Sequence, residues 1–124
     1  MKIQELSVGD WVRHTFYEEN VRIARIDGDS ERVLAERGKL SISCHLNHFE
    51  PIHITPEILE KNGWRNDMAD RNFWATDEVY IYNHEGVWRL RPKSPELLIV
   101  VDIKHVHELQ RAMNLLGIEK EIIL

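Results

Sequence analysis

The sequence lacks the features that would tie it to a membrane or to an oxidising compartment. Cys44 is the single cysteine, so no disulfide can form within the chain. No apolar run approaches the roughly 20 residues of a membrane-spanning helix, and no apolar signal core follows the N-terminal Met1–Glu5 segment. We therefore expect a soluble protein of a reducing cytoplasm with no membrane partner.

An excess of positive charge is also absent. The 124 residues carry 16 basic and 21 acidic side chains, which gives a formal net charge of −5. This balance disfavours non-specific binding to nucleic acid but is compatible with a local basic face. The length suits one compact domain, or one small domain with a docked extension.

Short strand-like runs begin at the segment LSVGDWV and continue to Pro51, with turn signals between them. The β-branched and aromatic composition that favours strands occurs at residues 11–17, 21–26, 32–36, 40–44 and 49–52. A single helical turn is expected at 45–48. Five strands with one helical turn before the last is the order of an SH3-like β-barrel. With Arg37 and Gly38 as a two-residue turn, Ala35 would face Leu40.

Different elements are expected after residue 54. Thr55 can cap a short helix that begins at Pro56. A hairpin follows, with strands at 78–82 and 87–91 that pair Tyr82 with Val87. Its inner face would carry apolar residues and its outer face tyrosines and arginines.

The last part of the chain predicts a buried strand and a helix. Leu97–Val101 is apolar at every position and is expected at the centre of a small sheet. Asp102 can cap an amphipathic helix that Gly117 ends, and the tail 118–124 would return as a strand or pack under that helix.

The expected fold class is therefore α+β. An N-terminal SH3-like five-stranded β-barrel at 1–54 is followed by a helix, a small antiparallel sheet and a C-terminal helix. Residues 55–124 would form an α+β extension packed against the barrel, or both parts would make one continuous domain.

Two histidine-rich segments raise the question of a metal or catalytic site. Cys44 offers a soft thiolate and His45, His48 and His53 offer imidazoles, but no second cysteine completes a structural zinc site. In the last helix, residues two apart point about 200° apart, so His105 and His107 would not address one substrate. Because no nucleophile motif or phosphate loop is present, we predict no enzyme, no catalytic residue, no metal and no cofactor.

The outer face of the predicted hairpin is the candidate binding surface. Tyr80, Tyr82 and Arg89 can stack on a ring or become buried against a partner. The alternative is ordinary packing, with the tyrosines stabilising the sheet.

Three segments of the chain resemble a group of short bacterial proteins of unknown activity, many of them encoded near phage or mobile-element genes. The resemblance lies in LSVGDWV, LNHFEPIHITPEILEKNGW and IKHVHELQRAMNLLGIEKEIIL, in the same order, and is loosest at 65–78. It implies a shared fold and a bacterial or phage cytoplasmic setting. It implies no activity, cofactor or site residue.

Two classes of function are left open. The first is a non-enzymatic interaction module that binds a protein partner or another copy of itself. The second is a nucleic-acid-associated accessory protein, which the net charge disfavours. A basic edge for that second function would consist of Arg22, Arg25, Arg32, Arg37 and Lys39.

Overall fold

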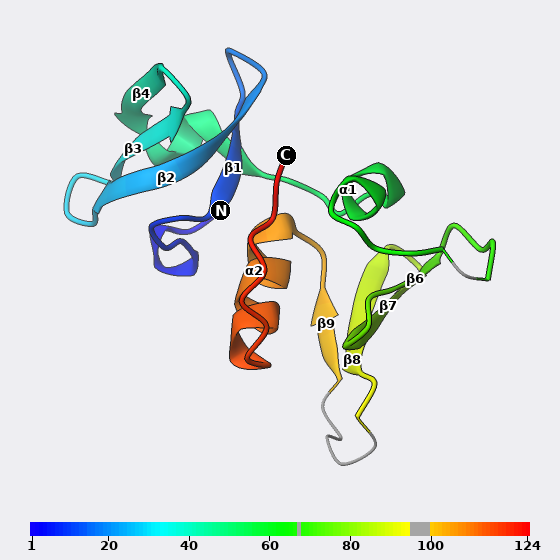
Figure 1. The fold of residues 1–124 in the computed structure, drawn as a ribbon. Coiled ribbons are helices and arrows are strands. Elements are labelled where there is room, and N and C mark those ends of the chain that lie inside the picture. Colours follow the sequence, from blue (N-terminus) through cyan, green and yellow to red (C-terminus); the bar gives the residue numbers. More distant parts are fainter. Residues whose placement is uncertain (67, 95–99) are drawn as a thin grey trace. The chain divides into compact units, whose positions relative to one another are not determined.

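A computed structural model describes residues 1–66, 68–94 and 100–124 of the chain (Figure 1). The chain divides into two compact units, Met1–Ile52 and His53–Leu124, each with its own sheet. The division falls two residues before the boundary expected from the sequence. The α+β class is confirmed.

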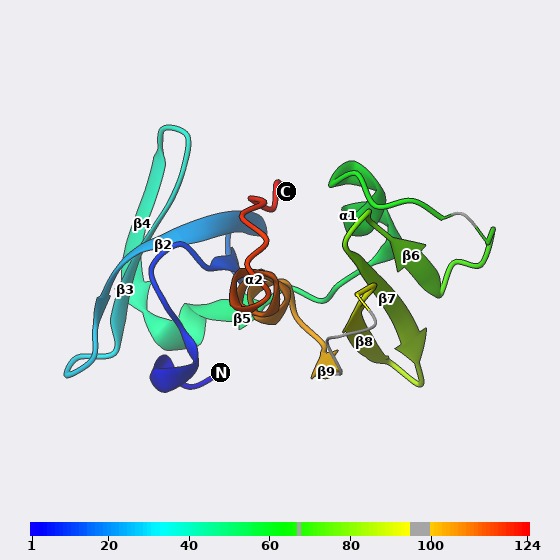
Figure 2. The ribbon, with the colours of Figure 1, turned by 60° about the horizontal axis from the view of Figure 1, so that its bottom comes forward.

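The first unit is a curled five-stranded antiparallel sheet that forms a half-barrel, in the order β4-β3-β2-β1-β5 (Figure 2). Its strands are β1 (Trp11–His14), β2 (Glu19–Asp27), β3 (Arg32–Arg37), β4 (Leu40–His45) and β5 (Phe49–Pro51). Single 3₁₀ turns lie before β1, at η1 (Ile3–Glu5), and before β5, at η2 (Leu46–His48). A bulge between Ile23 and Arg25 interrupts the pairing of β2 with β3. Such a bulge increases the local twist and bends the strand, which helps the sheet to curl.

Alternation along the strands builds the core of this unit. Its buried residues include Val12, Val21, Ile23, Val33, Ala35, Ile42 and Phe49. In β3 and β4 these positions alternate with exposed or half-buried ones, as expected for a sheet with one buried face.

The predicted register between β3 and β4 is wrong by two residues. Ala35 faces Ile42 and Arg37 faces Leu40, so the turn is Gly38-Lys39. Gly38 has φ +58°, which suits the first central position of a type II′ turn. Because side chains alternate with a period of two, this shift leaves every residue on its predicted face.

The second unit contains a four-stranded antiparallel sheet in the order β6-β7-β8-β9. Its strands are β6 (Phe73–Ala75), β7 (Val79–His84), β8 (Val87–Pro92) and β9 (Val101–Ile103). Two helices belong to the same unit, α1 (Pro56–Lys61) and α2 (Val106–Leu115). The inner face of the hairpin carries Val79, Ile81, Trp88 and Leu90, all at most 3% exposed.

The hairpin register is also shifted by two residues. Tyr82 faces Arg89 and His84 faces Val87, so only Glu85 and Gly86 form the turn. Both have positive φ, +53° and +84°, as a type I′ turn requires. The four-residue loop predicted from the sequence is therefore wrong, while the inner and outer faces are confirmed.

The two helices begin differently from each other. Thr55 caps α1 as predicted, because its hydroxyl accepts a hydrogen bond from the Ile58 amide at 3.3 Å. The predicted cap of α2 is wrong, since Asp102 lies in β9 and His105 occupies the N-cap position. Glu108 closes this capping box by accepting a hydrogen bond from the His105 amide at 3.1 Å.

The segment expected as a central strand falls largely outside the described residues, which omit 95–99. Its last residue, Val101, starts β9, and β9 is an edge of the described sheet rather than its centre. The tail after α2 has no regular structure, but Ile118, Ile122 and Leu124 are buried. Within the described ranges, no helix is long and apolar enough to cross a membrane.

Candidate functional site

Tyr80, Tyr82 and Arg89 lie on the outer face of the second sheet. Tyr80 and Tyr82 alternate along β7, and Arg89 on β8 stands directly opposite Tyr82. Arg91 stands opposite Tyr80 in the same way. The pleat thus gathers two tyrosines and two arginines on one surface.

A surface pocket of about 480 Å³ opens on this face. It is lined by Met68, Phe73, Ala75, Tyr80, Tyr82, Arg91 and Lys93. We call this group the sheet-face pocket. Tyr80 and Tyr82 both line it, whereas Arg89 lies beside it.

Short side chains and rings together shape the pocket floor. On β6, Phe73 stands opposite Tyr82 and Ala75 stands opposite Tyr80. The small Ala75 leaves space where a longer residue would fill the surface. The ring of Phe73 contacts that of Tyr80, with centroids 5.6 Å apart.

The cations around the pocket differ in how they are paired. Arg89 donates from Nε to Oδ1 of Asp102 at 3.0 Å. Its hydrogen bond to Tyr82, together with the charge of Asp102, raises the pKa of the Arg89 guanidinium. Lys93 places its ammonium 5.1 Å from the centre of the Tyr80 ring. Among the described residues, no carboxylate pairs with Lys93 or Arg91, and none lines the pocket. The pocket therefore combines an aromatic floor with two cations whose charge is not neutralised by a described neighbour.

Sequence reasoning missed Phe73, Met68, Ala75 and Lys93 as members of this surface. β6 is only three residues long and lies in a polar stretch, so the sequence pattern gives little indication that it pairs with β7. The aromatic pair Phe73-Trp74 was the available signal. Strand pairing would have placed Phe73 beside the tyrosines.

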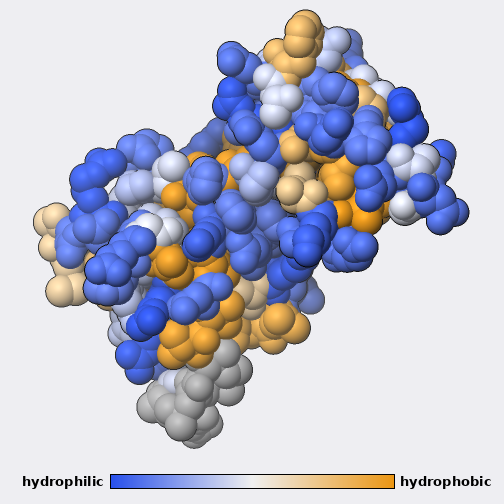
Figure 3. All heavy atoms as spheres, turned by 180° about the vertical axis from the view of Figure 1, so that it is seen from behind, coloured by the Kyte–Doolittle hydropathy of each residue, from blue (hydrophilic) through white to orange (hydrophobic). Residues whose placement is uncertain are grey.

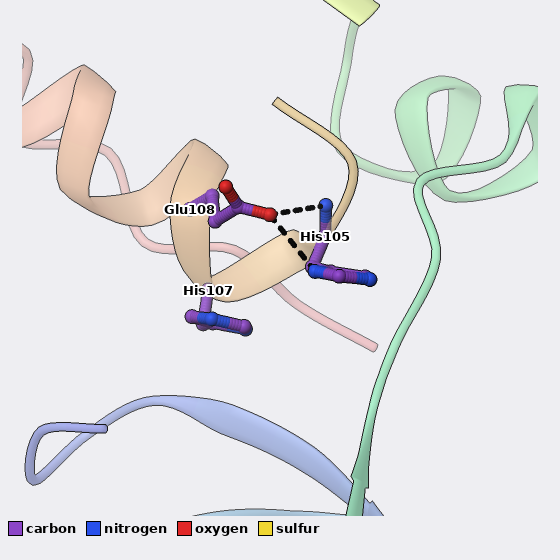
Figure 4. A group of neighbouring side chains, drawn as sticks. All are labelled: His105, His107 and Glu108. Carbon is purple, nitrogen blue, oxygen red and sulfur yellow. Dashed lines mark hydrogen bonds and ion pairs between the residues drawn. The ribbon is translucent and has the colours of Figure 1, made fainter. Parts of the chain in front are cut away.

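A second group of titratable side chains lies at the start of α2 (Figure 4). Ligand atoms of His105, His107 and Glu108 lie within 4.8 Å of one another. The expectation that His105 and His107 point in opposite directions is wrong, because His105 precedes the helix. Their rings are stacked, with centroids 5.6 Å apart and planes 8° from parallel. His107 is also buried, at 4% exposure, rather than on an exposed helix face.

The stacked arrangement is poorly suited to metal binding. An imidazole nitrogen coordinates along a lone pair in its ring plane, and two parallel stacked rings share no such plane. Glu108 accepts hydrogen bonds from Nδ1 of His105 at 2.8 Å and from the His105 amide. These contacts stabilise the first turn of α2.

The side chains of the other histidine-rich segment do not gather in one place. Cys44 faces His14, with Sγ 3.5 Å from Nε2, and His48 stacks on His14 at 6.2 Å. His45 instead pairs with Glu31 at 3.5 Å. His53 lies in the second unit, against His105. Burial raises the pKa of the Cys44 thiol, which disfavours a metal-binding thiolate.

The residues of the expected basic edge are spread over β2, β3 and the turn before β4. Arg22 and Arg37 both lie over the ring of Trp11, 5.4 and 5.9 Å from its centre. Arg32 stands at the other end of β3, opposite His45. Five strand positions separate Arg32 from Arg37, which corresponds to about 16 Å.

No protein-family model, no curated protein and no solved structure matches this chain. The resemblance to short bacterial proteins, with its phage or mobile-element setting, stays a prediction.

Proposed function

We propose that this protein is a non-enzymatic interaction module that binds a protein partner through the outer face of β6, β7, β8 and β9. The observation that carries the proposal is the sheet-face pocket, in which aromatic side chains form the floor and Arg91 and Lys93 contribute positive charge. Its volume lies in the range of pockets that hold a ligand, roughly 300–1,000 Å³.

The charges around the pocket support one kind of partner. The chain has a net charge of −5, yet the side chains that line this pocket include two cations and no described carboxylate. A partner segment with an aromatic side chain beside a carboxylate would place its ring against Tyr80 and Phe73 and its charge beside Lys93. Buried aromatic contacts would supply affinity, and charge pairing would supply orientation.

A peptide titration tests this proposal. The probe is a capped pentapeptide with tryptophan at its centre and aspartate on both sides, compared with the same peptide carrying asparagine at both flanks. We expect weak binding of the acidic peptide, with a dissociation constant of about 0.1–1 mM, and at least fivefold weaker binding of the asparagine peptide.

Variants locate the binding surface. Tyr80→Ala and Lys93→Gln should each weaken binding of the acidic peptide about fivefold or more, because they remove the ring and the charge. Val8→Ala and Lys39→Gln change exposed residues of the first unit and should leave binding unchanged. Equal affinity for both peptides, or an equal effect of the control variants, would refute the proposed site.

Association with nucleic acid is the second candidate, because rings beside cations can also stack on bases. The acidic chain and the separation of Arg32 from Arg37 weigh against it. Binding of an unstructured oligonucleotide that is tight at low salt and weakens steeply with added salt would favour this candidate.

The proposal also covers the fold family of the first unit and the cellular setting of the protein. We infer that the curled first sheet is an SH3-like barrel, which its strand order and the position of η2 before β5 support. The free thiol Cys44 is in keeping with a reducing bacterial or phage-associated cytoplasm.

A further inference from the structure

Two aromatic side chains stand exposed at the turn between β1 and β2. Phe16 is 79% exposed and Tyr17 is 57% exposed. Figure 3 shows that hydrophobic side chains reach the surface in patches among hydrophilic ones on the face it displays. Adjacent exposed aromatic residues are a common feature of binding surfaces. We call Phe16, Tyr17, Glu18 and Glu19 the aromatic tip.

Hydrogen bonds anchor the start of the aromatic tip to the sheet. The amide and the hydroxyl of Thr15 both donate to the carbonyl oxygen of His48, at 2.9 and 3.1 Å. The Tyr17 amide donates to Nδ1 of His14 at 3.2 Å. A preorganised loop loses little conformational entropy when it binds.

Acidic residues follow the two rings directly. The Glu18 side chain is 75% exposed, and its one ion pair within the described part of the chain, with Arg13, is long at 3.8 Å. Glu19 is exposed, and among the described residues no ion pair involves it. The aromatic tip therefore presents rings next to carboxylates, which is the chemistry proposed above for a partner of the sheet-face pocket.

We propose that the aromatic tip of one copy of this chain docks into the sheet-face pocket of a second copy. The inference rests on the proposed function of that pocket. Phe16 or Tyr17 would lie against Tyr80 and Phe73, and the tip carboxylates would lie beside Arg91 and Lys93. Both the apolar and the charged groups of the two surfaces are thereby matched.

Such a contact joins two different surfaces, so it is heterologous. Each copy keeps an unused tip and an unused pocket after one contact forms, so either a reciprocal second contact closes a dimer or further copies add. The contact is small, below the size of about 1,200 Å² typical of stable interfaces, so it is reversible and requires high protein concentration.

Sedimentation velocity of the full chain tests the inference. We expect the weight-average mass to rise between about 20 µM and 1 mM protein, as a weak contact requires. The rise should be smaller at high salt, because the charge pairs are exposed. Phe16→Ser and Lys93→Glu should each remain monomeric over the whole range.

Mixing the two variants gives the sharper result. The Phe16→Ser copy keeps an intact pocket and the Lys93→Glu copy keeps an intact tip, so an equimolar mixture should form a one-to-one complex that grows no further. Thermal melts of each variant, compared with those of the unsubstituted chain, check that the fold is retained. Lys39→Glu is the matched charge control and should associate like the unsubstituted chain.

Three outcomes would overturn the inference. They are a mass independent of concentration, self-association that survives both substitutions, and a mixture of the variants that stays monomeric. If the acidic peptide still binds the pocket in any of these cases, only the second copy as partner is refuted and the proposed function stands. If neither the peptide nor a second copy binds, both proposals fail.

Discussion

At the scale of single residues, Asn62 connects α1 to the C-terminal tail. Its Nδ2 donates to the carbonyl oxygens of Ile58 and Ile123, both at 2.8 Å, and its Oδ1 accepts from the Ile123 amide at 2.7 Å. The residue is 9% exposed. One buried amide thus satisfies backbone groups of two segments that are 61 residues apart.

We predict that Asn62→Ala lowers the free energy of unfolding by about 1–2 kcal/mol, since it removes three part-buried hydrogen bonds, two of them to the backbone of Ile123. Urea denaturation monitored by tryptophan fluorescence measures the change. Asn114→Ala, on the exposed side of α2, is the control and should change stability by less than about 0.5 kcal/mol. Equal effects of the two substitutions would contradict the proposed role of Asn62.

The protonation state of His14 affects a hydrogen bond of the aromatic tip. It is 5% exposed, and burial together with the nearby His48 lowers its pKa. Its Nδ1 accepts a hydrogen bond from the Tyr17 amide, so protonation at Nδ1 breaks that bond. The neutral ring is therefore the form that supports the folded state.

The unfolded chain binds a proton at His14 more readily than the folded chain does. The stabilisation that neutral His14 contributes is fully present above the ordinary histidine pKa of about 6.5. It is lost as the pH falls through the lowered pKa of His14 in the folded state. We predict a smaller pH dependence of stability between pH 7.5 and 5 for His14→Gln, measured by urea denaturation at each pH. His84→Gln, an exposed control, should keep the dependence of the unsubstituted chain, and an unchanged dependence in His14→Gln would rule the mechanism out.

At the scale of elements, the two hairpins show what local sequence patterns can and cannot predict. The alternation of apolar and polar residues placed Ile81 and Leu90 on the core face and Tyr80 and Tyr82 on the other. The same alternation cannot distinguish registers that differ by two residues, because both leave the faces unchanged. The turn dihedrals decide between them.

The position of Gly86 gives a direct test of that turn. Gly86→Ala should lower the free energy of unfolding by about 1 kcal/mol, because φ +84° is strained for a residue with a Cβ. Gly28→Ala is a matched control, since Gly28 lacks a positive φ and its Cβ would meet nothing within 4 Å. Thermal and urea denaturation of both variants measure the difference. A cost at Gly28 as large as that at Gly86 would refute the assigned turn.

Other elements were less predictable because their determinants are distant in sequence. Asp102 has the chemistry of a helix cap, but pairing of β9 with β8 places it opposite Arg89 and His105 becomes the cap. The sheet-face pocket depends in the same way on β6, whose Phe73 and Ala75 pair with β7. Tyr80 and Tyr82 were predictable because a single hairpin presents them.

At the scale of the whole molecule, the chain carries two proposed binding features, one in each compact unit. The first unit presents the aromatic tip on a preorganised turn, and the second presents the sheet-face pocket. Neither feature requires a reactive group. This combination favours a protein that binds other chains. A second copy of the chain carries a segment, the aromatic tip, that matches the sheet-face pocket.

Amide chemical shifts of the labelled full chain, recorded while the aspartate-flanked peptide is added, test the binding face most directly. The largest changes are predicted in β6, in residues 79–82 of β7 and in residues 89–93, because these surround the pocket. The asparagine-flanked peptide should cause smaller changes at the same amides. Changes confined to the first unit, or none at peptide concentrations of about 5 mM, would contradict binding at this face.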